Sequence, residues 1–267
     1  MQVACYFTPA LKWDDALPEV LQRQVDRGIA GLKNVSGIYI PRHYSPRADS
    51  IIRRELHSFC DGSARAYGAN VYLRQVDTLG RVYCSLVIAK NRVAPARKTL
   101  TIPRTELCSA VIAADLVTIV QREIPEKIDE VVLWSDSTTT LKFIANTHRR
   151  YQIFVGNRTQ HILGLTRVEQ WRFVEGVQNP ADDLTRGVVL TADASFDRSR
   201  RWFCGPEWLY LEPENWPQRA PTSTLQEDDP ELAKEKAVCF TAVAPESLMD
   251  SASSVRRMRM RIHGGVS

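Results

Sequence analysis

The stretch SFCDGSARAYGANVYL, residues 58–73, decides how this chain folds. From Tyr67 to Leu73 every second residue is apolar or aromatic, which is the alternation of a half-buried strand. Asp61 lies directly after the pair Phe59–Cys60 and before small, turn-forming residues. Burying an ionised carboxylate without a partner is very costly. Either Asp61 therefore holds a cation, or the interpretation of this stretch as a strand is wrong.

The composition is that of a soluble globular protein, with 267 residues, 44% of them hydrophobic and 25% charged. The net charge of +4 permits an anionic partner without requiring one. Six scattered cysteines without a C-x-x-C pair favour buried free thiols in a reducing compartment over a disulfide framework or a zinc site. No apolar run approaches the roughly 18 residues of a membrane span, and the start MQVACYFTPALKWDD does not have the pattern of a secretory signal. We expect an intracellular protein, cytoplasmic or nuclear.

The segment around the opening stretch predicts the element order β-β-β-α-β-α-α-β-α. Strands are predicted at 55–63, 68–76, 81–91, 131–136 and 169–176, with a turn at 78–80. Helices are predicted at 102–124, 137–146, 151–165 and 179–187. Pro103 opens the first of these helices, and Ser137 is well placed to cap the second. A mixed sheet with a helix after most later strands favours an α/β layer fold over a bundle or barrel.

Both flanks differ from this segment. Residues 1–50 contain a helix candidate at 17–35 and a strand-like piece at 38–44. They look like the end of a larger domain and not like a self-sufficient one. Residues 191–218 are rich in tryptophan and are expected to pack on the domain at 51–190. Residues 219–267 are polar, end in an arginine cluster and are expected to be disordered. That basic tail either is solvated or touches nucleic acid.

Four acidic residues fall at element positions that a fold could bring together. They are Asp61, Glu106, Asp136 and Asp182. Their wide separation excludes a local calcium loop, and each acid taken singly could instead be a helix cap or turn former. Gathered in one pocket they would repel each other unless divalent cations neutralised them. Oxygen ligands suit Mg²⁺ or Mn²⁺, and two such ions about 4 Å apart can clamp a phosphoryl displacement.

A basic segment precedes the long predicted helix and offers contacts to phosphate. Its cationic residues are Lys90, Arg92, Arg97, Lys98 and Arg104. Phosphate contacts of this kind give affinity for nucleic acid without reading its sequence. The alternative is a solvated linker with no ligand.

At these residues the sequence resembles the ribonuclease H-like region of Pol polyproteins from BEL/Pao-type LTR retrotransposons. The blocks that carry the resemblance are FCDGSARAYGANVYLR, LVIAKNRVAP, LTIPRTELCSAV, LWSDSTTTLKFI, FVGNRTQHI, WRFVEGVQNPADDLTRG and WFCGPEWL. LKWDDALPEVLQ and IPRHY resemble the stretch that joins reverse transcriptase to this region, so the likeness covers roughly residues 10–218.

The resemblance implies a ribonuclease H-like fold, a five-stranded mixed sheet flanked by helices with irregular N- and C-terminal flanks. It implies hydrolysis of the RNA strand of RNA–DNA hybrids during reverse transcription, with two Mg²⁺ or Mn²⁺ ions. Reverse transcriptase and integrase parts of the same polyprotein would be its partners, and no membrane or small-molecule cofactor is implied.

The same resemblance assigns roles to the acids. Asp61 would bridge both metals, Glu106 and Asp136 would join it on one ion, and Asp182 would hold the other ion beside the attacking water. Asn179 would brace the last loop.

Two features of that loop leave questions open. Asp183 is an adjacent alternative to Asp182, which the family block favours because the acid follows Pro-Ala directly. The loop VEGVQNPAD lacks the histidine that many ribonucleases H have there, which puts proton shuttling in doubt.

Other functions are less well supported by the residues. A non-catalytic nucleic-acid-binding or connecting remnant is the main alternative. The region is often labelled a Pao retrotransposon peptidase, but Asp-Gly-Ser at 61 and Asp-Ser-Thr at 136 do not fit the loop of an aspartic peptidase. A serine hydrolase motif, a Walker A loop and a dinucleotide glycine pattern are absent from the sequence.

Overall fold

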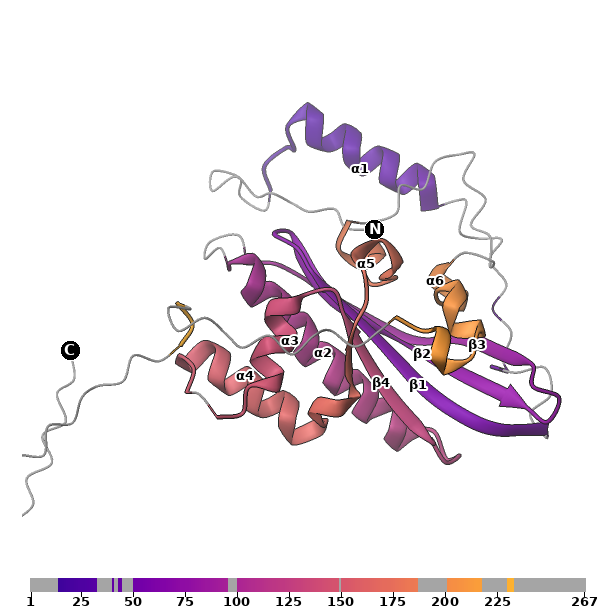
Figure 1. Ribbon diagram of the computed structural model, residues 1–267. Helices are drawn as coiled ribbons and strands as arrows, with labels where there is room; N and C mark the ends of the chain where they lie inside the picture. The colour runs from indigo at the N-terminus through magenta and orange to yellow at the C-terminus, as the bar shows by residue number, and fades with distance from the viewer. Residues whose placement is uncertain are drawn as a thin grey trace, which may run out of the picture. The chain divides into compact units, whose positions relative to one another are not determined.

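Five strands form one mixed sheet, as predicted, and their order in the sheet is β3-β2-β1-β4-β5 (Figure 1). The first three strands are antiparallel neighbours, and β4 and β5 run parallel to β1. The strands are β1 Ile51–Gly62, β2 Ala66–Asp77, β3 Val82–Val93, β4 Glu130–Ser135 and β5 Trp171–Phe173. Strand β5 is shorter than predicted. On either side of it the chain forms 3-10 turns at Val168–Gln170 and Gly176–Gln178, so backbone groups there are hydrogen-bonded within these turns.

The computed structural model describes residues 14–32, 40, 43–44, 50–95, 100–148, 150–186, 201–217 and 230–232. Two compact units divide the chain at residues 233 and 234, and the second unit lies outside the described residues. The helices are α1 Glu19–Leu32, α2 Ile102–Glu123, α3 Thr138–Ala145, α4 Ile153–Leu165, α5 Asp182–Arg186 and α6 Arg201–Cys204. Each described helix is too short or too polar to cross a lipid bilayer.

The predictions for the flanks can be checked only in part. The helix expected at 17–35 is present as α1. The strand-like piece at 38–44 lies mostly outside the described residues, and Ile40, His43 and Tyr44 are not in a strand. The tail at 219–267 also lies outside them, except for residues 230–232, which contact the domain.

The predicted turn at 78–80 is confirmed, and its geometry follows from two residues. The Asp77 carboxylate accepts hydrogen bonds from the backbone N–H groups of Leu79 and Arg81, each at 2.9 Å. Gly80 has a φ of +74°, a left-handed conformation that glycine adopts without steric cost. The turn places β3 beside β2 and makes β3 an edge strand of the sheet.

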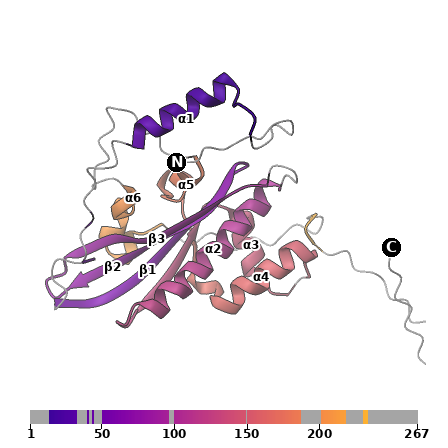
Figure 2. The ribbon, with the colours of Figure 1, turned by 180° about the vertical axis from the view of Figure 1, so that it is seen from behind.

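Helices α2, α3 and α4 cover one face of the sheet (Figures 1 and 2). The apolar face of α2 is buried there, although Val111 remains partly exposed. Cys60 and Leu133 point from β1 and β4 into the same cluster. Helix α2 runs so close to β1 that a Cβ on Gly62 would lie 2.4 Å from the backbone N of Glu106.

The tryptophan-rich extension packs on the domain, as predicted, and it covers the opposite face of the sheet. We call residues 201–217 the covering segment. Its Trp208 packs edge-on against Trp134 of β4, with ring centroids 4.7 Å apart, and also contacts Phe59 of β1. Because Phe59 and Cys60 are consecutive in a strand, they face opposite sides, and β1 is buried on both.

A buried charge network lies under the covering segment. The Glu55 carboxylate is fully buried and is paired with Arg74 Nη1 at 2.8 Å. Arg74 also donates to the carbonyl oxygens of Leu209, at 2.6 Å, and Leu211, at 3.2 Å. The guanidinium thus pairs with one oxygen of the buried acid and anchors the covering segment to the sheet at the same time, while Arg53 Nε pairs with the other oxygen.

His57 completes the network as a neutral ring. Trp134 Nε1 donates to His57 Nδ1 at 3.2 Å, so the proton sits on Nε2 and points at Glu55 Oε2, also 3.2 Å away. Burial lowers the pKa of His57 and keeps the ring uncharged near neutral pH. Burial alone would raise the pKa of Glu55, but the hydrogen bond to His57 and the nearby positive charges lower it to about 2.

Replacing Arg74 by methionine should lower the free energy of unfolding by about 1.5–3 kcal/mol, because the buried Glu55 would lose one charged partner and keep Arg53 and His57. The double variant Glu55→Gln with Arg74→Met should be less destabilised than the sum of the two single variants. Urea unfolding of the four proteins measures both quantities. Additive effects would show that the pair is not energetically coupled.

Candidate active site

The first two acids lie at the same edge of the sheet. Asp61 is near the end of β1, and Asp136 directly follows β4. Parallel pairing places Cys60 opposite Ser135, so one further step along both strands brings Asp61 level with Asp136. Neighbouring strands are about 4.8 Å apart, so the two carboxylates emerge beside each other.

Glu106 reaches the same edge from helix α2. The close approach of α2 to β1 at Gly62 fixes the height of this part of the helix above the sheet. Glu106 Oε2 accepts a hydrogen bond from Ser137 Oγ at 2.6 Å. Ser137 also caps α3, as predicted, because its Oγ accepts from the Thr140 N–H at 3.1 Å. The Ser137 hydroxyl therefore joins Glu106 to the start of α3, one residue after Asp136.

Helix α5 brings the fourth acid. Asp182 is its first residue, and Asp182 Oδ1 pairs with Arg186 Nε at 2.7 Å. Thr185, one turn later and buried, donates a short hydrogen bond to Asp61 Oδ2. This contact ties α5 directly to the acid at the end of β1.

Asn179 joins the loop before α5 to the sheet. Its side chain is fully buried, donates to the Cys60 carbonyl oxygen at 3.0 Å and accepts from the Ala181 N–H at 3.0 Å. The Asn179 side chain also forms a hydrogen bond with Asp136. The same residue thus contacts the backbone before one acid and the carboxylate of another.

The electrostatics identify Asp61 as the common neighbour of the other three acids. Burial, followed by the negative charge of Asp61, raises the pKa of Asp136 to about 7. Burial and Asp61 also raise the pKa of Glu106. For Asp182, burial and Asp61 raise the pKa while Arg186 opposes the rise. Mutual repulsion of this kind is expected where carboxylates converge without a cation.

The site fits a divalent cation by chemistry, although the acids are not arranged as a ready metal centre. All four donors are carboxylates, and their repulsion is what a bound Mg²⁺ or Mn²⁺ would relieve. Within the described ranges, however, no three His, Cys, Asp or Glu side chains are grouped closely enough to hold an ion. Hydroxyls of Thr185 and Ser137 instead occupy one oxygen each of Asp61 and Glu106.

Asp183 points away from this cluster. Its carboxylate is paired with Arg201 of α6, with Nη2 2.9 Å from Oδ1 and Nε 3.4 Å from Oδ2. Asp182 and Asp183 are adjacent in sequence but have different partners.

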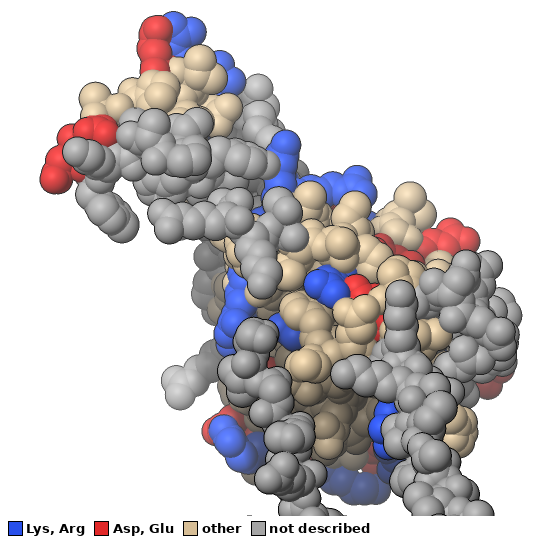
Figure 3. Space-filling model, turned by 90° about the vertical axis from the view of Figure 1, so that its left-hand side faces the viewer, with Lys and Arg blue, Asp and Glu red and all other residues tan. Residues whose placement is uncertain are grey.

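The residues that were predicted to contact phosphate lie in different environments. Lys90 and Arg92 are exposed on β3, whereas Arg97 and Lys98 lie outside the described residues. Arg104 is held by Glu231, with Nε 2.6 Å from Oε1 and Nη2 3.0 Å from Oε2. On the face shown in Figure 3, basic side chains occur in several separate groups, some beside acidic ones.

Three of the described cysteines are buried free thiols, as predicted. Cys60, Cys84 and Cys108 are buried and Cys204 is partly exposed, while Cys5 and Cys239 lie outside the described residues. Burial raises the pKa of Cys60, the neighbour of Asp61, to about 12, so this thiol stays protonated and is no nucleophile.

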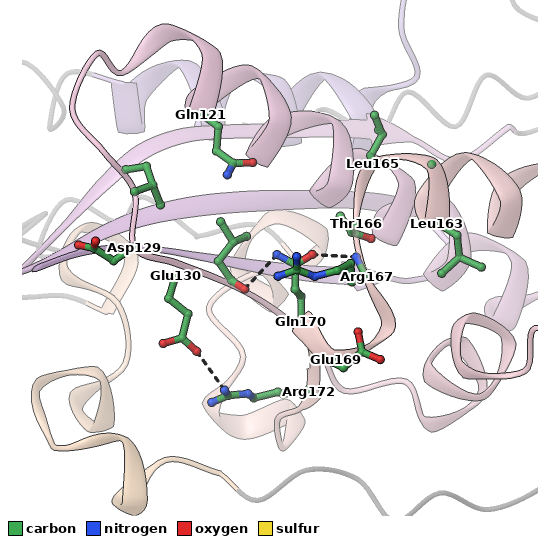
Figure 4. A pocket seen from close by; sticks show the side chains of 13 residues that line it. Gln121, Asp129, Glu130, Leu163, Leu165, Thr166, Arg167, Glu169, Gln170 and Arg172 are labelled. Atoms are coloured by element: carbon green, nitrogen blue, oxygen red, sulfur yellow. Dashed lines mark hydrogen bonds and ion pairs between the residues drawn. The ribbon is translucent and has the colours of Figure 1, made fainter.

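A polar pocket lies away from the acids (Figure 4). It is formed where β4 begins and where α2 and α4 end, and Arg172 donates to Glu130 at its wall, at 3.2 Å. None of the four acids lines it. The pocket is therefore separate from the candidate active site.

Sequence reasoning missed the residues that hold the acids in place. Thr185 and Arg201 were not singled out, and Ser137 was recognised only as a cap. The spacing of Thr185, three residues after Asp182 in a helix, could have indicated a shared face with that acid. No comparable sequence signal exists for Arg201, which is joined to Asp183 only by the packing of the covering segment.

The sheet order and the helices on both of its faces define a ribonuclease H-like domain. The model of the Pao retrotransposon-like RNaseH-like domain family matches residues 3–137, and the chain belongs to this family. The matched range includes Asp61, Glu106 and Asp136, and Asp182 lies beyond it. No curated protein matches the chain.

Solved ribonuclease H structures are similar to about half of the chain. The N-terminal RNase H domain of Rv2228c from Mycobacterium tuberculosis, fused to maltose-binding protein, is 12% identical, with 49% of this chain and 90% of that one covered and a TM-score of 0.33. RNase H1 from Halobacterium salinarum NRC-1 is 14% identical, with coverages of 50% and 94% and a TM-score of 0.32. LC11-RNase H1 in complex with RNA/DNA hybrid is 13% identical, with coverages of 51% and 96% and a TM-score of 0.34. The fold assignment rests on the sheet topology and the family match.

Replacing Asp136 by asparagine should stabilise the protein at alkaline pH and have little effect near pH 4. Asp136 has an ordinary pKa of 3.8 and a folded pKa of about 7, so between these values the unfolded chain loses its proton while the folded chain keeps it. Above pH 7 the carboxylate therefore destabilises the fold, by an amount on the order of 4 kcal/mol.

Urea unfolding at pH 4 and pH 8 in the presence of EDTA measures this difference. Adding Mg²⁺ should narrow it at pH 8, because a bound cation stabilises the charged carboxylate of the wild type only. An Asp136→Asn effect that is the same at both pH values would contradict the clustering of the acids.

Proposed function

We propose that this chain is a metal-dependent nuclease domain that hydrolyses the RNA strand of RNA–DNA hybrids. The observation that carries the proposal is the convergence of three acids with raised pKa values on Asp61, at the edge where β1 and β4 end. Two Mg²⁺ or Mn²⁺ ions held there would supply an activated water and stabilise negative charge on the scissile phosphate.

The residues of the chain have separate tasks in this proposal. Asp61 would contribute to both cation sites, because its charge acts on Glu106, on Asp136 and on Asp182. Asn179 would hold the loop and orient the Asp136 carboxylate. Since Asp136 holds its proton up to about pH 7 when no cation is present, cation binding at neutral pH should release a proton.

A binding domain without catalysis is the second candidate, and one observation favours it. Thr185 and Ser137 already satisfy oxygens of Asp61 and Glu106, so these acids do not depend on cations for their hydrogen bonds. Such a domain would bind hybrid but would not cut it. The reverse transcriptase and integrase parts of a polyprotein would remain its expected neighbours.

Asp136→Asn should abolish Mg²⁺-dependent cleavage of a labelled RNA–DNA hybrid by the full chain, with a loss of about 100-fold or more. Asp115→Asn is the matched control. Asp115 is also an acid of the domain, but it lies on α2 and pairs at the surface with His161 of α4. Gel analysis with single-stranded RNA and duplex DNA as further substrates tests the selectivity for hybrid.

Three outcomes separate the candidates. Cleavage that requires the metal and Asp136 supports the nuclease. Tight hybrid binding with no cleavage supports the second candidate. Cleavage that persists in Asp136→Asn or without divalent cations contradicts the proposed mechanism.

Glu231→Gln should strengthen binding to hybrid by about 3- to 10-fold, because the substitution removes the carboxylate that neutralises Arg104. The slope of log K against log salt should become steeper by about 0.9 if Arg104 then contacts one additional phosphate. Fluorescence anisotropy over a salt series measures both, with the exposed Glu207→Gln as the control. An unchanged salt slope would show that Arg104 does not contact the nucleic acid.

A further inference from the structure

One guanidinium connects the covering segment to the part of the chain that carries Asp182. Arg201 Nη1 donates to the Val177 carbonyl oxygen at 2.6 Å, and Nη2 and Nε donate to the two oxygens of Asp183. Val177 lies in the loop before α5, and Asp183 lies in the first turn of α5. Arg201 thus holds this region on both sides of residues 179–181.

Arg201 is itself attached to the sheet. The Tyr72 hydroxyl, on β2, lies 3.2 Å from the Arg201 carbonyl oxygen and 3.0 Å from the Trp202 carbonyl oxygen. Further along the covering segment, Arg74 binds the backbone of Leu209 and Leu211. The guanidinium therefore extends from a backbone that is fixed at several points.

Helix α5 depends on such external contacts. It has only five residues, far fewer than an isolated helix needs to be stable in water. The ion pair between Asp182 and Arg186 involves a mostly exposed arginine and adds little. Contacts from outside the helix include Thr185 with Asp61, the Leu184 carbonyl with Asn91, and Asp183 with Arg201.

We propose that Asp183 and Arg201 form a positioning pair for the fourth acid. The pair turns the Asp183 carboxylate toward α6 and orients the first turn of α5 so that Asp182 faces Asp61. Asp183 is then a structural partner of Arg201 and no cation ligand, and the covering segment contributes to the active site as well as to the core. The catalytic part of this inference rests on the proposed nuclease function, whereas the orientation of α5 can be tested without it.

The kinetic test compares five variants of the full chain on a labelled hybrid. Asp182→Asn should abolish cleavage. Asp183→Asn and Arg201→Ala should each lower kcat by about 10-fold, raise the Mg²⁺ concentration that gives half the maximal rate, and leave KM for the hybrid unchanged. Arg201→Lys should recover part of the loss, and the double variant Asp183→Asn with Arg201→Ala should be no worse than either single variant.

The matched control is Arg122→Ala, which removes an exposed ion pair with Glu123 on α2 and should leave rate and Mg²⁺ dependence unchanged. The proposal is overturned if Asp183→Asn is as damaging as Asp182→Asn while Arg201→Ala behaves like the wild type, because Asp183 would then be the ligand. Wild-type rates and Mg²⁺ dependence in both Asp183→Asn and Arg201→Ala would overturn it as well.

Hydrogen exchange separates failure of this inference from failure of the proposed function. In Arg201→Ala, the backbone amides of α5 should exchange at least about 10-fold faster than in the wild type, while those of α2 should not change. This result is expected even if the wild type cleaves no hybrid. Unchanged exchange in α5 would overturn the positioning role whatever the activity.

Discussion

Strand β1 has to be covered on both faces, and the rest of the structure depends on that requirement. It lies between β2 and β4, and its residues alternate between the cluster under α2 and the cluster under the covering segment. Cys60 faces one side and Phe59 the other. Asp61, one step further, is where the buried strand reaches the edge of the sheet. The acid is therefore fixed by apolar packing on two sides before any ligand is considered.

The two covers are built by different physical means. Helix α2 is held by an apolar stripe and by the absence of a side chain at Gly62. The covering segment has little regular structure and is held by tryptophan packing and by Arg74, which contacts Glu55 and two backbone carbonyls at once. A buried charge is costly unless every partner is present. The second cover is thus more dependent on a few specific contacts than the first.

Much of this architecture could be predicted from the sequence, because its signals are local. Alternation gave the first three strands, Gly80 marked the turn, and Ser137 marked the start of a helix. The four acids could be singled out because each has a recognisable position within or beside a predicted strand or helix. The partners of the acids were not found, because Arg201 and Thr185 meet them only after the chain has folded. Contacts between polar residues far apart in sequence leave no periodic pattern.

The packing of Trp208 and Trp216 on β1 and β4 has a consequence for how the domain can be excised. A fragment that stops at residue 190, where the sequence alone would place the boundary, would leave an aromatic sheet surface open to water. Such a fragment should self-associate or require detergent, and loss of its activity would say nothing about the acids. Expression clones and natural cleavage products should retain the chain at least through residue 217.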